Sequence, residues 1–479
     1  MKSSVILPLL AILTFYYPKA YGQNSFFDAR VNEYGQLEQV LGDKWNEIDS
    51  LIVYGPINEA DFKTIVRSAK DGHLKIVNLQ HALVENNKIP NYAFVDKAWY
   101  DSGRYLDIRR IILPDNITEF GACAFLKLAL RHINMPSSLK KMGEGCFEDN
   151  KWLEVNPLII PEGVTEIPIR CFPWCENLKK IVLPSTLKTI DILAFYCTSI
   201  QEMNFPEGLD SIGHSAIYVT NLTEIVLPNT VKKLGNAAFQ GNKKLKKLVL
   251  PKGITEIPIR FCYQSPMLED LEIPKSVIKI HNTAFSSCTK LNIQLPPAVK
   301  WIDYEAFDNC ALDSIVFPAS VEFIGGAAFS GLQSLQKIYS LSPTPPICGQ
   351  HPMMDKGCGP FHGFTPSDIP VYVPVGSGEK YRQAFGWNYF SNIIETDKLP
   401  TGIVSPQTGN AGQYNVYGKD GKLVIDILNT LPYPLRYSIY SISGELIEQG
   451  LLTESLHLQM KSDGVYLVRI GATTHKVFL

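Results

Sequence analysis

The sequence lacks the charge patterns that are typical of nucleic-acid-binding and disordered proteins. Its 45 lysines and arginines nearly balance its 47 aspartates and glutamates, and no basic block or acidic tail stands out. This balance argues against a nucleic-acid partner and against a long solvated tail. After the first 22 residues, the chain also has no apolar run long enough to cross a membrane as a helix. We therefore expect a mature chain without a transmembrane segment that binds no nucleic acid.

The short motifs of common active sites and metal sites are missing as well. There is no HExxH, no GxSxG and no glycine-rich phosphate loop, and the nine histidines are scattered along the chain. His351 and His362 lie near Cys348 and Cys358, but this spacing fits no standard zinc site, so we interpret the histidines as polar loop residues. We expect that the protein is not an enzyme and that it has no catalytic residue, metal ion or cofactor.

What the sequence does have is a repeat of 22 to 25 residues. Its prolines are Pro114, Pro136, Pro161, Pro184, Pro206, Pro228, Pro251, Pro274, Pro296 and Pro318. Eleven residues after most of them comes an aromatic residue: Phe125, Phe147, Phe172, Phe195, Phe239, Phe285, Phe307 and Phe329. Ile217 replaces it once, and Phe261 comes one residue early. A fixed period of this length predicts a solenoid whose units bury their apolar faces by stacking.

Each repeat predicts a short strand and side chains for a continuous core. Apolar residues stand one and three before each proline, as Leu113 and Ile111 do, and this alternation predicts a half-buried strand that the proline ends. Further apolar positions and the aromatic residue complete the core, so we expect the phenylalanines to stack along a β-rich solenoid. The hexapeptide TEIPIR occurs at Thr165–Arg170 and at Thr255–Arg260, four repeats apart, which supports duplication.

The residues two before each proline are expected to point to solvent, and they include Asn134 and Asn204. The apolar members form a candidate ligand face: Ile112, Ile159, Val182, Val226, Val249 and Val316. A mostly charged or polar column, four before each proline, flanks them. Exposed apolar patches often mark interaction sites. Because β-branched residues are also favoured in strands for their own sake, the functional and the structural interpretation both stay open.

The first 22 residues have the pattern of a secretory signal. Lys2 precedes an apolar core at Val5–Tyr17, and Ala20-Tyr21-Gly22 offers a small-x-small cleavage site before Gln23. An N-terminal anchor helix is the alternative, but the apolar run is well short of the ~20 residues needed to span a bilayer. We expect cleavage near Gly22/Gln23 and a protein that is secreted or displayed on the outer cell surface.

Most of the ten cysteines follow the repeat. Those at fixed positions before or after the aromatic residue are Cys146, Cys171, Cys175, Cys288 and Cys310. Free cysteine behaves as a small buried hydrophobe, and we prefer this interpretation to five disulfides. Cys348 and Cys358 differ, because they bracket a ten-residue loop outside the repeats. We treat this pair as a candidate disulfide that forms after export.

Regions without the proline period flank the array, and they divide the chain into segments. A helix from Ala60, a strand from Leu74 and a degenerate repeat at Ile89–Phe94 predict an N-terminal cap, because the end units of a solenoid are atypical. Residues 397–412 are rich in Pro, Gly, Thr, Ser and Asn and predict a linker, and the short strands after them predict a small β-sandwich. The expected segments are a signal peptide (1–22), an N-terminal cap (23–95), repeats (96–340), a C-terminal cap (341–396), the linker (397–412) and the sandwich (413–479).

The repeat resembles BspA-type, or treponemal-type, leucine-rich repeats. The pattern "xxVxxIgxxAFxxC" is seen in "LKKIVLPSTLKTIDILAFYC" from Leu178 and "LDSIVFPASVEFIGGAAFSG" from Leu312, and the resemblance covers residues 96–340. Members of that family are mostly bacterial or protozoan surface proteins associated with adhesion and host-protein binding. The resemblance implies a cell-surface adhesin that recognises a host protein or glycan through its array. A secreted scaffolding protein without a ligand is the alternative, and an accessory module of a hydrolase is a distant third.

The tail resembles the C-terminal sorting domain of type IX secretion substrates in Bacteroidetes. The stretches "IYSISGELIEQG" and "DGVYLVRI…HKVFL" carry the resemblance, with matching positions at Gly444, Gly464, Tyr466 and Lys476. The chain departs from that pattern at Ser462-Asp463, where a proline usually precedes the glycine. The resemblance implies secretion machinery as a partner of the tail.

Overall fold

The structure is a computed structural model that describes residues 25–96, 103–351 and 358–400, together with parts of the tail. The described parts of the tail are residues 414–419, 422–427, 435–441, 445–452, 455–460, 465–470 and 473–478. The expected signal peptide and most of the expected linker lie outside the described residues. So do Gly444, Ser462, Asp463 and Gly464, on which part of the resemblance of the tail rests.

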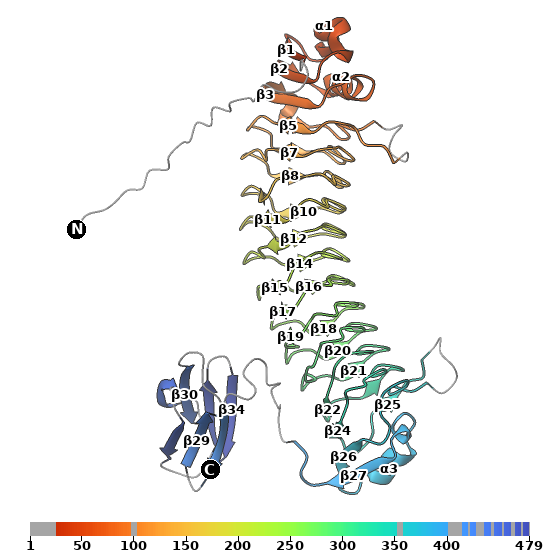
Figure 1. Cartoon of the computed structure of the whole chain (residues 1–479), viewed down its shortest axis with the longest axis vertical. Coiled ribbons are helices and arrows are strands. Elements are labelled where there is room, and N and C mark those ends of the chain that lie inside the picture. Colours follow the sequence, from red (N-terminus) through yellow and green to blue (C-terminus); the bar gives the residue numbers. More distant parts are fainter. Residues whose placement is uncertain are drawn as a thin grey trace, which may run out of the picture.

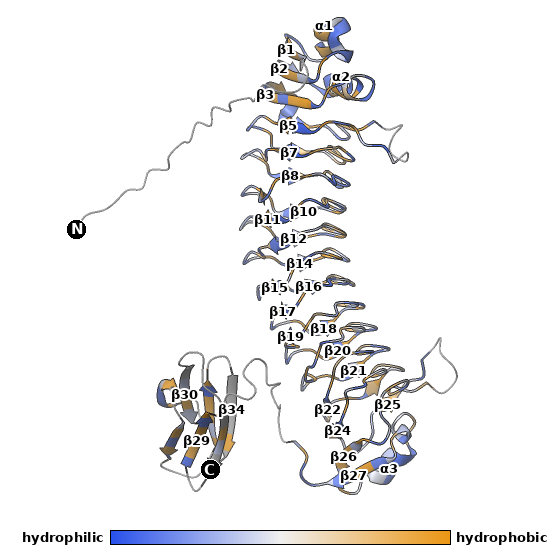
Figure 2. Ribbon diagram, viewed as in Figure 1, coloured by the Kyte–Doolittle hydropathy of each residue, from blue (hydrophilic) through white to orange (hydrophobic). Residues whose placement is uncertain are grey.

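The repeats form an elongated β-solenoid (Figure 1), which confirms the fold predicted from the proline period. A typical turn contributes a first strand, which ends near the proline, and a second strand, which follows it. Strands of successive turns pair in parallel and in register, as Ile167, Ile190 and Ile212 do. Apolar and polar residues alternate within the turns (Figure 2), because successive side chains of a strand point to opposite faces.

Two rows of short strands run along the solenoid. The first strands are β5 (Arg110–Ile112), β7 (His132–Ile133), β9 (Leu158–Ile159), β11 (Lys180–Val182), β13 (Glu202–Met203), β15 (Glu224–Val226), β17 (Lys247–Val249), β19 (Asp270–Leu271) and β22 (Ser314–Phe317). The second strands are β4 (Lys88–Ile89), β6 (Glu119–Phe120), β8 (Lys141–Met142), β10 (Glu166–Ile167), β12 (Thr189–Ile190), β14 (Ser211–Ile212), β16 (Lys233–Leu234), β18 (Glu256–Ile257), β20 (Lys279–Ile280), β21 (Trp301–Ile302), β23 (Phe323–Ile324) and β25 (Ile347–Cys348).

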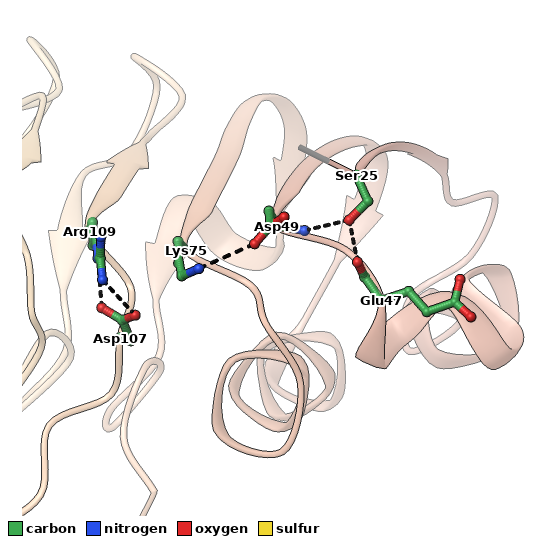
Figure 3. A network of polar contacts seen from close by, with 6 residues as sticks. All are labelled: Ser25, Glu47, Asp49, Lys75, Asp107 and Arg109. Carbon is green, nitrogen blue, oxygen red and sulfur yellow. Dashed lines mark hydrogen bonds and ion pairs between the residues drawn. The ribbon is translucent and has the colours of Figure 1, made fainter. Parts of the chain in front are cut away.

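The N-terminal segment extends the row of first strands. Strands β1 (Phe26–Arg30), β2 (Ser50–Ile57) and β3 (Ile76–Val84) join β5 and β7 in one sheet. The helix and strand predicted from Ala60 and Leu74 are α2 (Glu59–Lys70) and β3, and a short helix, α1 (Leu37–Leu41), precedes them. Side-chain contacts hold this segment together (Figure 3), as where the Lys75 ammonium donates to the Asp49 carboxylate at 3.3 Å, and in the next turn Arg109 donates to Asp107.

The core contains a ladder of fully buried aromatic rings. In its first part, ring centroids of successive turns are 5.0–5.5 Å apart, and the members are Phe94, Phe125, Phe147, Phe172 and Phe195. After an interruption at Ile217 the members are Phe239, Phe261, Phe285, Phe307 and Phe329. Phe261, which comes one residue early in the sequence, meets both adjacent rings edge to face instead of stacking on them.

Two rows of residues in the left-handed backbone conformation flank this ladder, with φ between 49° and 62° at the non-glycine members. The row before the rings is Cys123, Gly145, Arg170, Leu193, Ser215, Ala237, Arg260, Thr283, Glu305 and Ala327. The row after them is Lys127, Asp149, Trp174, Cys197, Val219, Gly241, Gln264, Ser287, Asn309 and Gly331. This conformation aims backbone N–H groups at the next turn, as where Val219 donates to the carbonyl of Gln240 at 2.9 Å.

A further row, three residues after the ring in most turns, donates hydrogen bonds to backbone carbonyls beside the ladder. Cys175, Cys288 and Cys310 occupy it, and their thiols lie 3.2–3.3 Å from a carbonyl oxygen. All ten cysteines are free, and burial raises the pKa of Cys288 to about 12. The predicted burial of the repeat cysteines is thus confirmed, and Cys175, Cys288 and Cys310 also act as weak hydrogen-bond donors.

The array ends in a further sheet and a small helix. Strands β24 (Lys337–Ser340), β26 (Pro370–Pro374) and β27 (Asn392–Thr396) follow β22 in one sheet, and α3 (Gly378–Gln383) lies between the last two strands in sequence. Phe361 stacks on Phe329 at 5.9 Å, and the fully buried Trp387 packs against Phe361 at 5.5 Å. These rings cover the last member of the aromatic ladder.

The tail has its own hydrophobic core. Its strands are β28 (Tyr414–Lys419), β29 (Lys422–Ile427), β30 (Leu435–Ser441), β31 (Leu446–Leu452), β32 (Leu456–Gln459), β33 (Val465–Ile470) and β34 (Thr473–Phe478). They pair as two antiparallel sheets, β28-β29-β32 and β31-β30-β33-β34, which share one cluster of buried side chains. This is the arrangement of a small β-sandwich. Of the helices in the part of the chain that the structure describes, none has the length and apolar character needed to cross a membrane.

Candidate ligand-binding surface

A groove crosses the outer surface of the first strands, which we call the strand face. This strand-face groove has a volume of about 870 Å³ and lies over β11, β13, β15 and β17. Its apolar lining includes Val182, Val226 and Val249 of the predicted ligand face, together with Met203 and Phe205. Val226 is 49% exposed and Val249 39% exposed, so this part of the lining is open to solvent.

The groove lies where the sheet is interrupted. Among the described strands, β13 pairs only with β11, and β15 pairs only with β17. At the end of the β11–β13 pair, the side-chain amide of Asn204 takes over backbone bonding: it accepts from the Leu183 N–H at 2.7 Å and donates to the Leu183 carbonyl at 2.9 Å. In an intact pair of strands, a backbone carbonyl of the next turn accepts the corresponding hydrogen bond, as where the Leu227 N–H donates to the Val249 carbonyl at 3.0 Å. Strand β13 ends just before Asn204, and the two sheets separate between β13 and β15.

Ion pairs border the groove in the column four before the prolines. Lys180 on β11 pairs with Glu202 on β13, and Lys247 on β17 pairs with Glu224 on β15 at 2.8 Å. The hydrogen bond to Glu224 raises the pKa of Lys247. Because each of these cations has an acidic partner on an adjacent turn, the border is close to neutral. Exposed pairs of this kind contribute little to stability, so a ligand can displace them at small cost.

The structure brings together only part of the predicted ligand face. Three of its six residues line the groove, and Ile159 lies beside Val182 in register on β9 and is 57% exposed. Ile112 and Val316 are half-exposed and belong to two other sheets, on β5 and β22. The six residues therefore do not form one continuous stripe.

Two asparagines of the outward column are exposed, as expected, but their side chains also bond the backbone of the preceding turn. Like Asn204, Asn134 bonds the preceding turn, accepting from the Leu113 N–H at 2.7 Å and donating to its carbonyl at 3.0 Å. Each of them ends a sheet, since β7 and β13 are edge strands. The signal was present in the sequence: both turns read Asn, a large apolar residue and proline, whereas most other turns have an aliphatic pair before the proline.

Sequence reasoning also missed aromatic residues at the C-terminal end of the strand face. Tyr339 and Tyr372 stand in register with Val316, and their rings stack at 4.9 Å. Tyr372 lies two before Pro374, so the rule that identified the predicted ligand face would have found it.

The loop that contains Cys348 and Cys358 has no disulfide, and both residues are free thiols. Burial raises the pKa of Cys348 to about 12, and Cys358 is also buried. The pairing of these two cysteines after export stays a prediction. The imidazole Nε2 of His351 lies 3.2 Å from the Glu305 carboxylate. Within the described residues, no cluster of three or more His, Cys, Asp or Glu side chains could hold a metal ion.

A family model described as "BspA type Leucine rich repeat region (6 copies)" matches residues 63–171, 87–220, 150–264 and 255–344. Together these matches cover residues 63–344, more than half of the chain. A search of curated proteins found no match.

Among solved structures, the chain is similar to a leucine-rich repeat protein from Bacteroides ovatus, with 23% identity, a TM-score of 0.50 and coverage of 67% of this chain and 88% of that one. Pneumococcal vaccine antigen PcpA matches with 18% identity, a TM-score of 0.43 and coverage of 73% and 79%. A leucine rich cell surface protein from Faecalibacterium prausnitzii matches with 17% identity, a TM-score of 0.31 and coverage of 67% and 85%. The likeness to the Bacteroides ovatus protein shows a shared fold.

Proposed function

Because the chain belongs to the BspA-type leucine-rich repeat family, we propose that it is an exported surface protein whose array binds a host protein or glycan. The strand-face groove carries the proposal. Its floor of exposed valines beside Met203 and Phe205, bordered by ion pairs, has the apolar centre and polar rim of a protein–protein interface. An extended segment of an extracellular protein is therefore the occupant that suits this groove, and a glycan is the other outcome of the test.

The test is a binding screen of the mature chain against extracellular-matrix proteins and glycans. Val182→Glu combined with Val226→Glu should weaken binding at least tenfold, because the two carboxylates enter the apolar floor. The melting temperature should stay nearly unchanged, since both side chains face solvent. Leu83→Glu is the matched control, because Leu83 is 59% exposed on β3 and lies outside the groove. Unchanged binding by the double variant would show that the binding site lies elsewhere on the chain. If none of the matrix proteins and glycans binds, the scaffolding alternative is favoured.

Delivery to the surface is assigned to the tail. The support is its resemblance to sorting domains and the exposed apolar side chains of the edge strand β31, where Leu446 is 46% and Leu451 60% exposed. Deletion of residues 413–479 should prevent surface delivery in cell fractionation while the signal peptide still directs export. Unchanged delivery would show that the tail is an ordinary accessory domain.

A further inference from the structure

A second groove lies on a different side of the solenoid, along the turns that carry the left-handed residues. We call this side the turn face. The turn-face groove has a volume of about 640 Å³, and it shares no lining residue with the strand-face groove. Its lining is aromatic and polar: Tyr196, Tyr218, Asn236, Gln240, Arg260 and Asn282 are among its members.

One end of this groove is a stack of aromatic rings. The rings of Tyr196 and Tyr218, on successive turns, are 4.7 Å apart and inclined by only 10°, and Trp174 on the turn before meets Tyr196 edge to face at 5.7 Å. Both tyrosines are half-exposed. Because the two rings cover one face of each other, the stack offers its partly exposed outer side, and such an aromatic surface suits the C–H groups of sugars, which combine an apolar body with polar edges.

The two copies of TEIPIR each end in an arginine, and the two arginines differ in their charged partners. In the first copy, the Arg170 guanidinium is neutralised by the Glu148 carboxylate on the preceding turn, with Nε and Oε2 3.2 Å apart, and it lies over the ring of Trp174. In the second copy, the corresponding cation is Arg260. Gln240 stands where the first copy has the glutamate, and Gln264 stands where it has the tryptophan.

Arg260 therefore carries a charge that the array does not neutralise. Its side chain is exposed, and no described carboxylate lies within salt-bridge distance of it. Asn282 and Asn236 line the groove on the adjacent turns and are exposed. The side-chain oxygen Oδ1 of Asn236 accepts from the Ile259 N–H at 3.2 Å, which leaves the NH2 group of Asn236 to donate to a ligand. The acid of the groove, Glu305, is held by His351.

We propose that the turn-face groove binds an oligosaccharide that carries a carboxylate. The sugar carboxylate pairs with Arg260, whose planar guanidinium suits bidentate recognition of carboxylates. A sugar ring packs against the exposed side of the stacked Tyr196 and Tyr218 rings, and the amides of Asn236 and Asn282 bond hydroxyl groups of the oligosaccharide. This site is independent of the strand-face groove and of the protein ligand proposed for it, and the source of the carboxylate is either a uronic acid or a sialic acid.

The mature full chain is titrated by calorimetry with a galacturonate hexamer and with 3′-sialyllactose. The matched neutral probes are the methyl-esterified hexamer and lactose. At least one acidic probe should bind at least tenfold more tightly than its neutral counterpart, and the pair that shows the difference identifies the source. Equal affinity for acidic and neutral probes in both pairs would overturn the proposal.

Gln240→Glu is the decisive variant, because it recreates the Glu148–Arg170 arrangement beside Arg260. It should lower affinity for the acidic probe at least tenfold with an unchanged melting temperature, and Arg260→Gln and Tyr218→Ala should also weaken binding. The strand-face variant Val226→Glu should bind the probe normally, which separates this site from the one under Proposed function. If Gln240→Glu and Arg260→Gln both bind as the wild type does, Arg260 is not the carboxylate site and the proposal fails.

Discussion

At the scale of single residues, the side chain three residues after the aromatic ring determines whether the buried backbone carbonyls beside the ladder accept a hydrogen bond. Asn242 donates to the carbonyls of Ile217 and Phe239, both at 2.8 Å, and its own oxygen accepts from the Thr220 N–H at 2.8 Å and the Thr220 hydroxyl at 2.6 Å. Asn150 donates in the same way, but its Oδ1 is buried with no hydrogen-bond partner among the described residues. Leu128 stands at the position that corresponds to Thr220.

Asn242→Ala should lower the free energy of unfolding by about 2–4 kcal/mol, because the Ile217 carbonyl and the N–H and hydroxyl of Thr220 lose their bonds to Asn242, and the Phe239 carbonyl keeps only the Ser265 hydroxyl at 3.4 Å. Asn150→Ala should cost less, since it also removes an oxygen whose burial is uncompensated. Urea unfolding of both variants measures the difference. An equal or larger loss for Asn150→Ala would show that its oxygen is satisfied after all.

The left-handed rows make a second residue-scale prediction, on Gly241 and Val219. Gly241 has φ of 73°, and a Cβ added there would lie 2.7 Å from Cγ2 of Val219 on the preceding turn. Gly241→Ala should therefore destabilise by about 1–2 kcal/mol through backbone strain and this contact. Val219→Gly removes the contacting methyl group, so the double variant should lose less than the sum of the two single variants. Strict additivity in a double-mutant cycle would contradict the close approach.

At the scale of elements, the aromatic ladder joins the turns into one core. Phe195 is fully buried, with its ring 5.5 Å from that of Phe172 on one side and Ile217 at the ladder position on the other. Phe195→Ala should lower the free energy of unfolding by about 3–5 kcal/mol, because neighbouring turns that are held by their own hydrogen bonds cannot collapse into the cavity. Val226→Glu, on the exposed strand face, is the control and should cost far less. Similar losses from the two variants would mean that Val226 is a core residue.

The same elements show how far the sequence could be interpreted. The proline and phenylalanine periods predicted the solenoid, the stacked rings and the burial of the repeat cysteines, because a period reports which side chains must meet. It did not predict the strand-face groove, because the groove lies at a break in the sheet between β13 and β15. Asn204 stands in an outward column, and only its bonds to Leu183 show that its side chain takes over backbone bonding at the end of β13. The left-handed rows were also missed, because most of their members are not glycine.

At the scale of the whole molecule, the described residues form two hydrophobic cores. One runs from Ala29 to Ile393 and contains the aromatic ladder, and the other lies within the tail, from Leu423 to Val477. Because no buried cluster of described residues is shared between them, we expect the stability of one not to depend on side-chain packing in the other. In a solenoid, each turn contacts mainly its neighbours, so its unfolding is governed by the interactions between adjacent turns. A small sandwich, by contrast, unfolds as one unit.

We therefore expect the array and the tail to unfold independently, and the distribution of tryptophan makes this easy to measure. All six tryptophans lie before residue 400, so tryptophan fluorescence follows the array alone, while circular dichroism follows both units. In urea, the two probes should give transitions that do not coincide. Deletion of residues 413–479 should leave the fluorescence transition in place, and Phe195→Ala should shift that transition only. Coincident transitions that move together in the Phe195→Ala variant would show that the two cores are coupled through contacts between the array and the tail.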